Sequence, residues 1–317
     1  MRDERILVVC GPTASGKTAL SIALAKMLGG EVVSADSMQL YRGMDIGTAK
    51  PTAAEMDGVP HHMLDILEPG EPFSVALYAK QAGEWVEDIR ARGKVPIVCG
   101  GTGLYIDGLL RGTEFQPLPE DGALRQRLEA QWEQFGAEAL LSRLREIDPE
   151  TGARLHPNDK RRILRALEVY ECTGEPLSVH DRRSRAQKPR FTAVRLGLTA
   201  RERRVLYDRI DRRVDVMLER GLEQEVRALQ NAGKLTGTAA QAIGYKEFAE
   251  YFAGERTLEE TADLIRQKSR NYAKRQLTWF RRDPGVHWIE LEENEGAAEA
   301  LQKATIFLQA EAYNGGE

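Results

Sequence analysis

Short apolar segments in the first hundred residues predict the strands of a buried sheet. Residues 6–10 (ILVVC) form a continuous apolar run without alternation, which is typical of a strand covered on both faces of a parallel sheet. Residues 31–35 and 95–99 are two further strand signals. Pro96 fits the start of the last strand better than its middle, because proline cannot donate a ladder hydrogen bond.

Helical periodicity lies between these strands. It covers residues 17–28, where Gly29 and Gly30 end the helix, and residues 74–92. A polar stretch rich in glycine and proline, residues 41–72, separates the second strand from the second helix. The alternation of strand and helix predicts a doubly wound α/β core with a parallel sheet.

The pattern changes after Arg111. The segments that follow are a linker at 112–121, helical patterns at 123–146 and 158–172, and a basic, irregular stretch at 182–190. The strand signal and helical patterns that come next are residues 191–198, then 200–232, 258–279 and the acidic tail. We therefore predict a discontinuous core, residues 1–113 and 192–317, interrupted by a small helical domain at residues 114–191.

Composition excludes several classes of protein. A chain of 317 residues is long enough for about two domains of ordinary size. Its 42% hydrophobic and 30% charged residues are typical of a globular chain rather than a disordered or fibrous one. No apolar run approaches the roughly 18 residues of a membrane span, and no signal peptide precedes the first strand. Three distant cysteines without a CxxC exclude a disulfide framework and a zinc-finger spacing. We expect a cytoplasmic protein with no membrane partner.

Charge is distributed unevenly along the chain. The net charge is −4, yet residues 266–282 hold seven Lys or Arg and no acid, and residues 160–190 hold nine basic residues against four acids. Seven Glu against one Lys between residues 290 and 317 compensate. A single basic run is usually a solvated helix face. Two such segments in a net-acidic chain favour a polyanionic partner.

One motif carries specific chemistry. Residues 11–18, GPTASGKT, match the phosphate-binding P-loop pattern GxxxxGK[ST] and lie between a buried strand and a helix. The glycines let backbone N–H groups converge on an anion at the positive end of the helix dipole. Lys17 supplies a cation, and the Thr18 hydroxyl can bind Mg²⁺. The motif indicates a di- or triphosphate ligand without specifying ATP or hydrolysis. The residues expected to hold the phosphates are Gly11, Pro12, Thr13, Ala14, Ser15, Gly16, Lys17 and Thr18.

The ends of the other two strands add candidate residues. The second strand is followed by Asp36 and the third by a GGTG turn that contains Thr102. Because ligands bind at the carboxyl ends of parallel strands, both side chains are expected beside the bound phosphate. From the residues alone, Asp36 holds Mg²⁺, acts as a general base or caps a helix. The GGTG turn is weak evidence by itself, although its glycines permit close approach of a flat ring.

A cluster of cations opens the second helix of the insertion. Asn158 and Asp159 can cap a helix whose first turns carry Lys160, Arg161, Arg162 and Arg165. Cations at a helix N-terminus oppose the macrodipole, so an external anion such as an RNA backbone would relieve them. Pairing with Glu168 explains only part of this charge.

With these residues in view, the chain resembles the tRNA dimethylallyltransferase (tRNA isopentenyltransferase) family. The motifs that carry the resemblance extend from the first strand to near the C-terminus. They are GPTASGKT at 11–18, SADSMQLYRGMDIGTAKP at 34–51, HHMLDI at 61–66, GGTGLY at 100–105, HPNDKRRILRALEV at 156–169, RIDRRVDVML at 209–218, QAIGYKE at 241–247 and YAKRQLTWFR at 272–281.

The resemblance implies transfer of a dimethylallyl group from dimethylallyl diphosphate to N6 of an adenosine next to the anticodon of tRNA, with release of diphosphate. The phosphate loop, Lys17 and Mg²⁺ near Thr18 would stabilise the departing diphosphate. Arg213 matches a family arginine that grips the diphosphate, and Arg209 would assist it. Asp36 matches the catalytic carboxylate that removes a proton from the amine. Thr102 is similar to the residue that orients the same amine.

The resemblance also implies which residues contact the tRNA anticodon stem-loop. The target base must leave its stack and enter a tunnel lined by residues 36–39. Residues 266–282 would complete the basic face, with their aromatics either in the core or stacked on bases. The residues expected to contact RNA are Asp36, Ser37, Met38, Gln39, Thr102, Arg125, Arg127, Arg161, Arg162, Ile163, Leu164, Arg165, Gln241, Ala242, Ile243, Gly244, Tyr245 and Lys246.

Three other functions fit part of the sequence. A small-molecule kinase with a phosphate loop leaves the basic segments and the insertion without a role. An isopentenyltransferase of free adenine nucleotides does not need an insertion that grips RNA. A non-catalytic, nucleotide-dependent RNA-binding switch gives Asp36 and Thr102 no shared role. The absence of a coiled-coil pattern or a long apolar stripe favours a monomer.

Overall fold

The computed structural model describes residues 5–112, 122–186 and 188–314 and divides the chain into two compact units. Unit 1 comprises Met1–Leu110 and Phe191–Glu317, and unit 2 comprises Arg111–Arg190. The linker predicted at residues 112–121 lies almost entirely outside the described part. No helix in the described residues is long and apolar enough to cross a bilayer.

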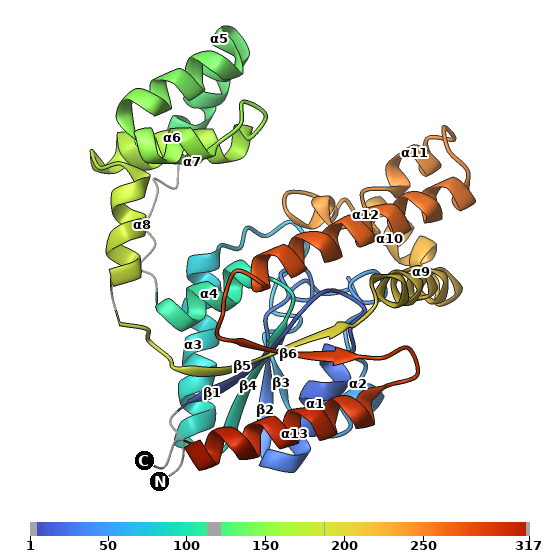
Figure 1. Cartoon of the computed structure of the whole chain (residues 1–317). Helices are drawn as coiled ribbons and strands as arrows, with labels where there is room; N and C mark the ends of the chain where they lie inside the picture. Colours follow the sequence, from blue (N-terminus) through green and yellow to red (C-terminus); the bar gives the residue numbers. More distant parts are fainter. Residues whose placement is uncertain (1–4, 113–121, 187, 315–317) are drawn as a thin grey trace. The chain divides into compact units, whose positions relative to one another are not determined.

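Unit 1 contains a parallel sheet of six strands in the order β3-β2-β4-β1-β5-β6 (Figure 1). This confirms the predicted doubly wound α/β class. The strands are β1 Ile6–Cys10, β2 Gly30–Ser34, β3 His61–His62, β4 Val95–Gly100, β5 Ala193–Ala200 and β6 Val286–Leu291. Both central strands β1 and β4 are almost completely buried, as their unbroken apolar sequences require.

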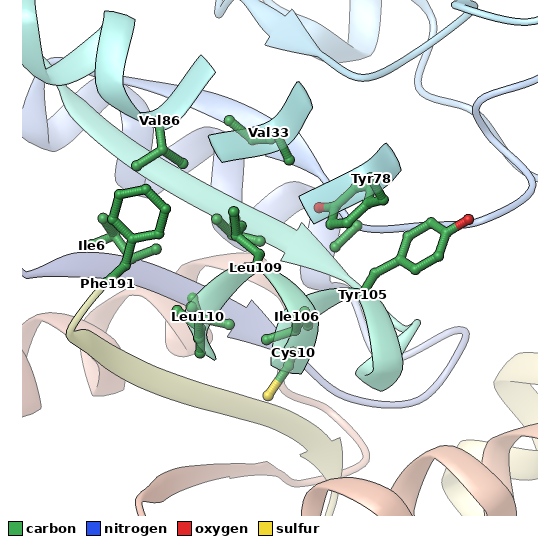
Figure 2. Close-up of a cluster of buried hydrophobic side chains, with 14 of the residues drawn as sticks. Ile6, Cys10, Val33, Tyr78, Val86, Tyr105, Ile106, Leu109, Leu110 and Phe191 are labelled. Atoms are coloured by element: carbon green, nitrogen blue, oxygen red, sulfur yellow. The ribbon is translucent and has the colours of Figure 1, made fainter. Parts of the chain in front are cut away.

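Two layers of helices cover the sheet of unit 1. One face packs against α1 (Lys17–Leu28) and α13 (Ala297–Asn314). The other packs against α3 (Val75–Ala91) and α4 (Gly103–Arg111), where Val86 and Leu109 approach Val33 and Ile6 of the strands (Figure 2). Tyr78 lies in the same layer and stacks on a second tyrosine with ring centroids 4.2 Å apart.

A further group of helices lies beyond the carboxyl ends of the strands in unit 1. It comprises α9 Arg203–Glu219, α10 Leu222–Asn231, the 3-10 helix η1 Ala239–Gln241, α11 Phe248–Phe252 and α12 Leu258–Phe280. Their apolar faces share a core with residues of the 41–72 stretch, including Tyr41 and Met44. That stretch also contains the short helix α2, Ala53–Met56. The helices therefore build a wall above the strand ends, where a ligand is expected.

The described residues of unit 2 form four helices around their own apolar core. They are α5 Ala123–Ile147, α6 Pro149–Arg154, α7 Lys160–Thr173 and α8 Leu177–Ala186. Helix α5 is kinked at Gly136, whose φ of 81° and ψ of 171° are not helical. Asp159 is the N-cap of α7, but its carboxylate accepts a hydrogen bond from the His156 N–H instead of from the helix.

The structure corrects four local predictions. The pattern at residues 200–232 forms two helices because the chain turns at Gly221, with φ of 96°. Residues 182–186 are helical rather than irregular, since α8 continues to Ala186. Strand β6, between the pattern at 258–279 and the acidic tail, was not predicted, although its alternating VHWIEL sequence suits a half-exposed edge strand. The tail itself is helical, as predicted, in α13. Strand β3, only two residues long, gave no hydrophobic pattern to detect.

Candidate active site

The phosphate loop connects β1 to α1, as the motif predicts. Gly11 has φ of 141°, and a Cβ atom there would lie 2.3 Å from the carbonyl oxygen of Leu198. Gly16 is the N-cap of α1 with φ of 93°. These two positions therefore accept glycine alone, and they bring the loop against the start of the helix. Ser15 is buried, and its hydroxyl has no hydrogen-bond partner among the described residues.

Lys17 lies at the floor of this loop. Its ammonium group donates a hydrogen bond of 2.5 Å to the Pro12 carbonyl. The pKa of Lys17 is lowered to about 8, mainly by burial and also by the nearby Arg213 cation, against the opposing effect of the Asp36 carboxylate. A poorly solvated cation next to a second cation is a strong binding site for an anion.

The ends of β2 and β4 meet at a common rim. Thr102 accepts a 3.1 Å hydrogen bond from the Ser37 N–H through its hydroxyl and donates one of 3.1 Å from its backbone to the Ala35 carbonyl. Asp36 accepts a 2.9 Å hydrogen bond from the Met38 N–H at Oδ1. Among the described residues, Oδ2 of Asp36 has no hydrogen-bond partner. The carboxylate thus caps the local turn with one oxygen and keeps the other for a ligand.

A cavity of about 530 Å³ opens over the loop and the rim. Both Lys17 and Asp36 line it, so the predicted cation and carboxylate share one space. The other predicted residues that line this cavity are Thr13, Thr18, Ser37, Met38, Gln39, Arg213, Gln241, Ala242, Ile243, Gly244 and Lys246. Much of the remaining wall is apolar and includes Val214, Met217 and Ile265. A cavity with a polar floor and an apolar wall suits a ligand that joins a diphosphate to a hydrocarbon.

The two arginines of α9 that were expected to act together lie in different surroundings. Arg213 lines the cavity, donates a 3.3 Å hydrogen bond to the Thr48 carbonyl and has a pKa that burial lowers. Arg209 instead donates to the carbonyl of Glu295 at 3.0 Å, beside the start of α13, and does not line the cavity. These contacts give no support to a role of Arg209 beside Arg213, which stays a prediction.

The stretch that precedes Pro51 is fixed to α10 by a single carboxylate. Glu225 accepts hydrogen bonds from the backbone N–H groups of residues 45, 46 and 47, at 3.0, 2.8 and 3.1 Å. The Tyr245 hydroxyl donates to the same carboxylate at 2.5 Å. Tyr245 is almost fully buried, so its predicted contact with RNA is corrected to a structural role. No sequence motif revealed Glu225, because its partners are backbone groups 178 or more residues away.

Helix α12 contributes cavity residues that were not assigned individually from the sequence. Four of them, Lys268, Tyr272, Arg275 and Gln276, lie within nine consecutive residues of this helix. The pKa of Tyr272 is raised to about 12, mainly by burial and also by the charge of Asp36. Of the aromatics whose role was open, Phe280 belongs to the core and Tyr272 faces the site. The family motif at 272–281 indicated that this segment belongs to the site, but it did not show which of its side chains line the cavity.

The basic residues predicted to contact RNA from unit 2 fall into two groups, according to whether an acidic side chain pairs with them. Arg125 pairs with Glu129 and Glu168, and Arg127 pairs with Glu171. In contrast, no acid among the described residues lies within ion-pair distance of the arginines of α7, which are Arg161, Arg162 and Arg165.

Two of the predicted RNA contacts lie inside unit 2 rather than on its surface. Ile163 and Leu164 have no exposed surface and pack in its core. The prediction that their side chains contact RNA is therefore corrected, because a buried apolar side chain in a packed core offers nothing to a phosphate.

The donor set at the phosphate loop fits a magnesium ion. The described residues contain no cluster of three or more His, Cys, Asp or Glu side chains that would hold a metal by themselves. Thr18 and Asp36 nevertheless present a hydroxyl and a carboxylate to the cavity. Mg²⁺ usually keeps waters and binds one or two protein oxygens together with substrate phosphates. The residues present suit such an ion and no all-protein cage.

Comparison with known proteins agrees with this site. The family model described as IPP transferase matches residues 39–283, and one described as isopentenyl transferase matches residues 4–68. A tRNA dimethylallyltransferase of Geobacillus thermodenitrificans is 51% identical over 305 residues, 96% of each chain. One of Carboxydothermus hydrogenoformans is 46% identical over 310 residues, 98% of each chain.

Solved structures give the same result. The full-length tRNA isopentenylpyrophosphate transferase of Bacillus halodurans is 44% identical, with a TM-score of 0.72 over 97% of this chain and 96% of the other. A eukaryotic dimethylallyltransferase captured acting on tRNA is 29% identical, with a TM-score of 0.80 over 97% of this chain and 80% of the other. The resemblance inferred from the motifs is confirmed, and the chain belongs to the IPP transferase family of tRNA dimethylallyltransferases.

Proposed function

We propose that this protein transfers the dimethylallyl group of dimethylallyl diphosphate to N6 of the adenosine next to the anticodon of tRNA and releases diphosphate. One observation carries the proposal: Lys17 of the phosphate loop and Asp36 of the strand rim open on the same cavity. Lys17 can therefore stabilise the negative charge of the leaving group, and Asp36 can remove a proton from the amine, within the same cavity.

The first part of the reaction concerns the leaving group. As the allylic C–O bond breaks, negative charge develops on the diphosphate oxygens. The loop amides, Lys17 and Arg213 are fixed in advance around this position, so they stabilise the charge without reorganising. Thr18 would hold Mg²⁺, which supplies further charge neutralisation for the diphosphate when it is bound.

The second part concerns the nucleophile. The exocyclic amine of adenine is weakly nucleophilic because its lone pair is delocalised into the ring, so a base must remove a proton as the C–N bond forms. Oδ2 of Asp36 is free for this role, while Oδ1 is held by the Met38 N–H. Thr102 lies one hydrogen bond from Ser37 and orients the same amine.

The RNA would be held by surface cations outside the reacting centre. Lys246, Lys268 and Arg275 line the cavity wall and are exposed, so they suit the backbone around a flipped base. In unit 2, the arginines at the start of α7 supply a surface for phosphates. A kinase or an enzyme of free nucleotides has no use for this second group.

The test is a substrate panel. The protein and Mg²⁺ are incubated with labelled dimethylallyl diphosphate and, separately, unmodified tRNA, AMP or ATP. We expect label in tRNA alone. Label in AMP or ATP would identify an isopentenyltransferase of free nucleotides. Phosphate transfer from ATP to a small molecule, without prenyl transfer, would identify a kinase.

A further inference from the structure

Helix α12 bonds to both catalytic loops through one side chain. Gln276 is 5% exposed, and its Oε1 accepts a 2.8 Å hydrogen bond from the Thr13 N–H of the phosphate loop. Its Nε2 donates a 2.9 Å hydrogen bond to the carbonyl of Gly101 in the GGTG turn. The two loops follow neighbouring strands, β1 and β4, and one primary amide spans the gap between them.

The space around this bridge is filled. A Cβ atom at Gly101 would lie 2.0 Å from Nε2 of Gln276 and 3.5 Å from the carbonyl oxygen of Gly11. Two positions along the turn, a Cβ atom at Gly103 would meet the Trp279 ring at 2.2 Å. Helix α12 therefore packs against the turn at both Gly101 and Gly103. A shift of the Gln276 amide away from one loop would break its hydrogen bond to the other.

The amide of Gln276 matches the chemistry of both partners. The Thr13 N–H requires an acceptor and the Gly101 carbonyl requires a donor, and both bonds are made where water has little access. A carboxylate supplies only acceptors, and an apolar side chain leaves both backbone groups unpaired.

We propose that Gln276 is a positioning residue that sets the separation between the phosphate loop and the rim. This inference rests on the proposed function, in which the loop holds the leaving diphosphate and the rim holds the amine. Gln276 touches neither reacting atom. It acts through Thr13 on one side and through Gly101, the neighbour of Thr102, on the other.

The kinetic consequence follows from this geometry. Without the bridge each loop keeps its own hydrogen bonds and still binds its own substrate. The distance between the allylic carbon and the amine is no longer fixed, and a misplacement of about 1 Å costs on the order of 10²-fold in rate. The expected defect is thus in kcat and not in KM.

The experiment compares Gln276→Ala with the wild type in the tRNA prenylation assay. We expect kcat to fall about 10- to 100-fold, while KM for both substrates changes less than about threefold. Gln230→Ala is the matched control, because that glutamine is exposed at the end of α10, away from the cavity. A kcat within about twofold of the wild type, or a defect confined to KM, would overturn the inference.

Two further variants separate positioning from a general loss of structure. Gly101→Ala forces the amide of Gln276 aside, so it should reproduce the kcat defect, and the double variant should be no worse than either single variant. Gln276→Glu keeps the acceptor for Thr13 but must be protonated to donate to Gly101. Its activity relative to the wild type should therefore rise as the pH falls.

The outcomes are distinguishable from failure of the proposed function. If the wild type does not prenylate tRNA, the proposed function fails and this inference fails with it. If the wild type is active but the Gly101 and Gln276 defects multiply in the double variant, or Gln276→Glu follows the wild-type pH profile, the inference alone fails. Gly101→Ala carries the test if Gln276→Ala does not fold.

Discussion

Two groups of cations are suited to bind phosphate, but they differ in exposure to solvent. One lines the cavity of unit 1, and the other is the set of arginines at the start of α7 in unit 2. Lys17 and Arg213 are enclosed, and burial lowers the pKa of each. Arg161 and Arg162 are exposed on a helix surface. Because charges interact more strongly where water is scarce, the first pair can act on a charge that appears during the reaction. The second pair is screened by salt and contributes affinity.

Local structure decides which cations belong to each group. Arg213 donates to the Thr48 carbonyl and Lys17 to the Pro12 carbonyl, and no carboxylate of the residues that the structure describes forms an ion pair with either. In unit 2 the charge of Arg127 is already balanced by Glu171. Position in the sequence does not distinguish a neutralised arginine from an available one, whereas contacts do. The comparison can be tested by substitutions in the cavity and by substitutions among the arginines of α7.

The largest effect is expected at the carboxylate of the cavity. Asp36→Asn keeps an oxygen to accept the Met38 N–H but removes the basic oxygen, and Asp36→Ala removes both. We expect prenyl transfer to fall by about 10²- to 10⁴-fold in either variant, with tRNA affinity within about threefold of the wild type. Single-turnover transfer and filter binding measure the two quantities. Wild-type-like turnover in Asp36→Asn would remove Asp36 as the base.

The next effect concerns the enclosed cation. Lys17→Met replaces the ammonium group by an apolar group of similar length, so the developing charge on the diphosphate loses a preorganised partner. We expect kcat to fall by about 10²- to 10³-fold, as when one oxyanion donor is removed, and tRNA binding to be unchanged. If the variant instead lost tRNA affinity and kept kcat, the enclosed cation would belong with the surface group, and the comparison would fail.

The sequence predicted those parts of the site that depend on neighbours in the chain. The phosphate loop and the strands on either side of it are local, so residues 11–18 located the anion site. The rim required one more step, the rule that parallel strands end at a common edge, and Thr102 does lie one hydrogen bond from Ser37, the neighbour of Asp36. Lys17 and Asp36 share a cavity for the same reason.

Contacts between distant segments were not predictable in this way. Glu225 reaches backbone groups nearly 180 residues away, and Gln276 reaches Thr13 across 263 positions. Arg209 and Arg213 lie one helical turn apart, yet neighbouring elements send them to different partners. Ile163 and Leu164 share a motif with exposed arginines but face the other side of α7. In each case tertiary packing, and not local pattern, decides the role.

The surface group should show the opposite signature to the cavity. Replacing Arg161, Arg162 and Arg165 together by Ala should weaken tRNA binding about tenfold or more at low salt and reduce the slope of log affinity against log salt by about 1 for each lost phosphate contact. At saturating tRNA, kcat should remain near the wild-type value. Arg127→Ala should have a smaller effect, because Glu171 already neutralises that charge. An unchanged salt slope in the triple variant would exclude this surface from RNA binding.

The smallest effect is a pH dependence that distinguishes the enclosed cation from the exposed ones. The pKa of Lys17 is lowered to about 8 in the free protein, and a bound diphosphate must raise it. Binding therefore takes up a proton above about pH 8, and affinity falls as the pH rises through that value, by at most about tenfold per pH unit. Calorimetry of diphosphate binding at pH 7.5 and pH 9, in buffers of different ionisation enthalpy, measures both the loss and the proton uptake. Lys17→Arg stays charged over this range, so its affinity for diphosphate should not fall.

The arginines of α7 do not titrate in this pH range, so tRNA affinity should depend on salt far more than on pH. A diphosphate affinity that depends on salt but not on pH would contradict the comparison, because it would show that Lys17 is as well solvated as the arginines of α7.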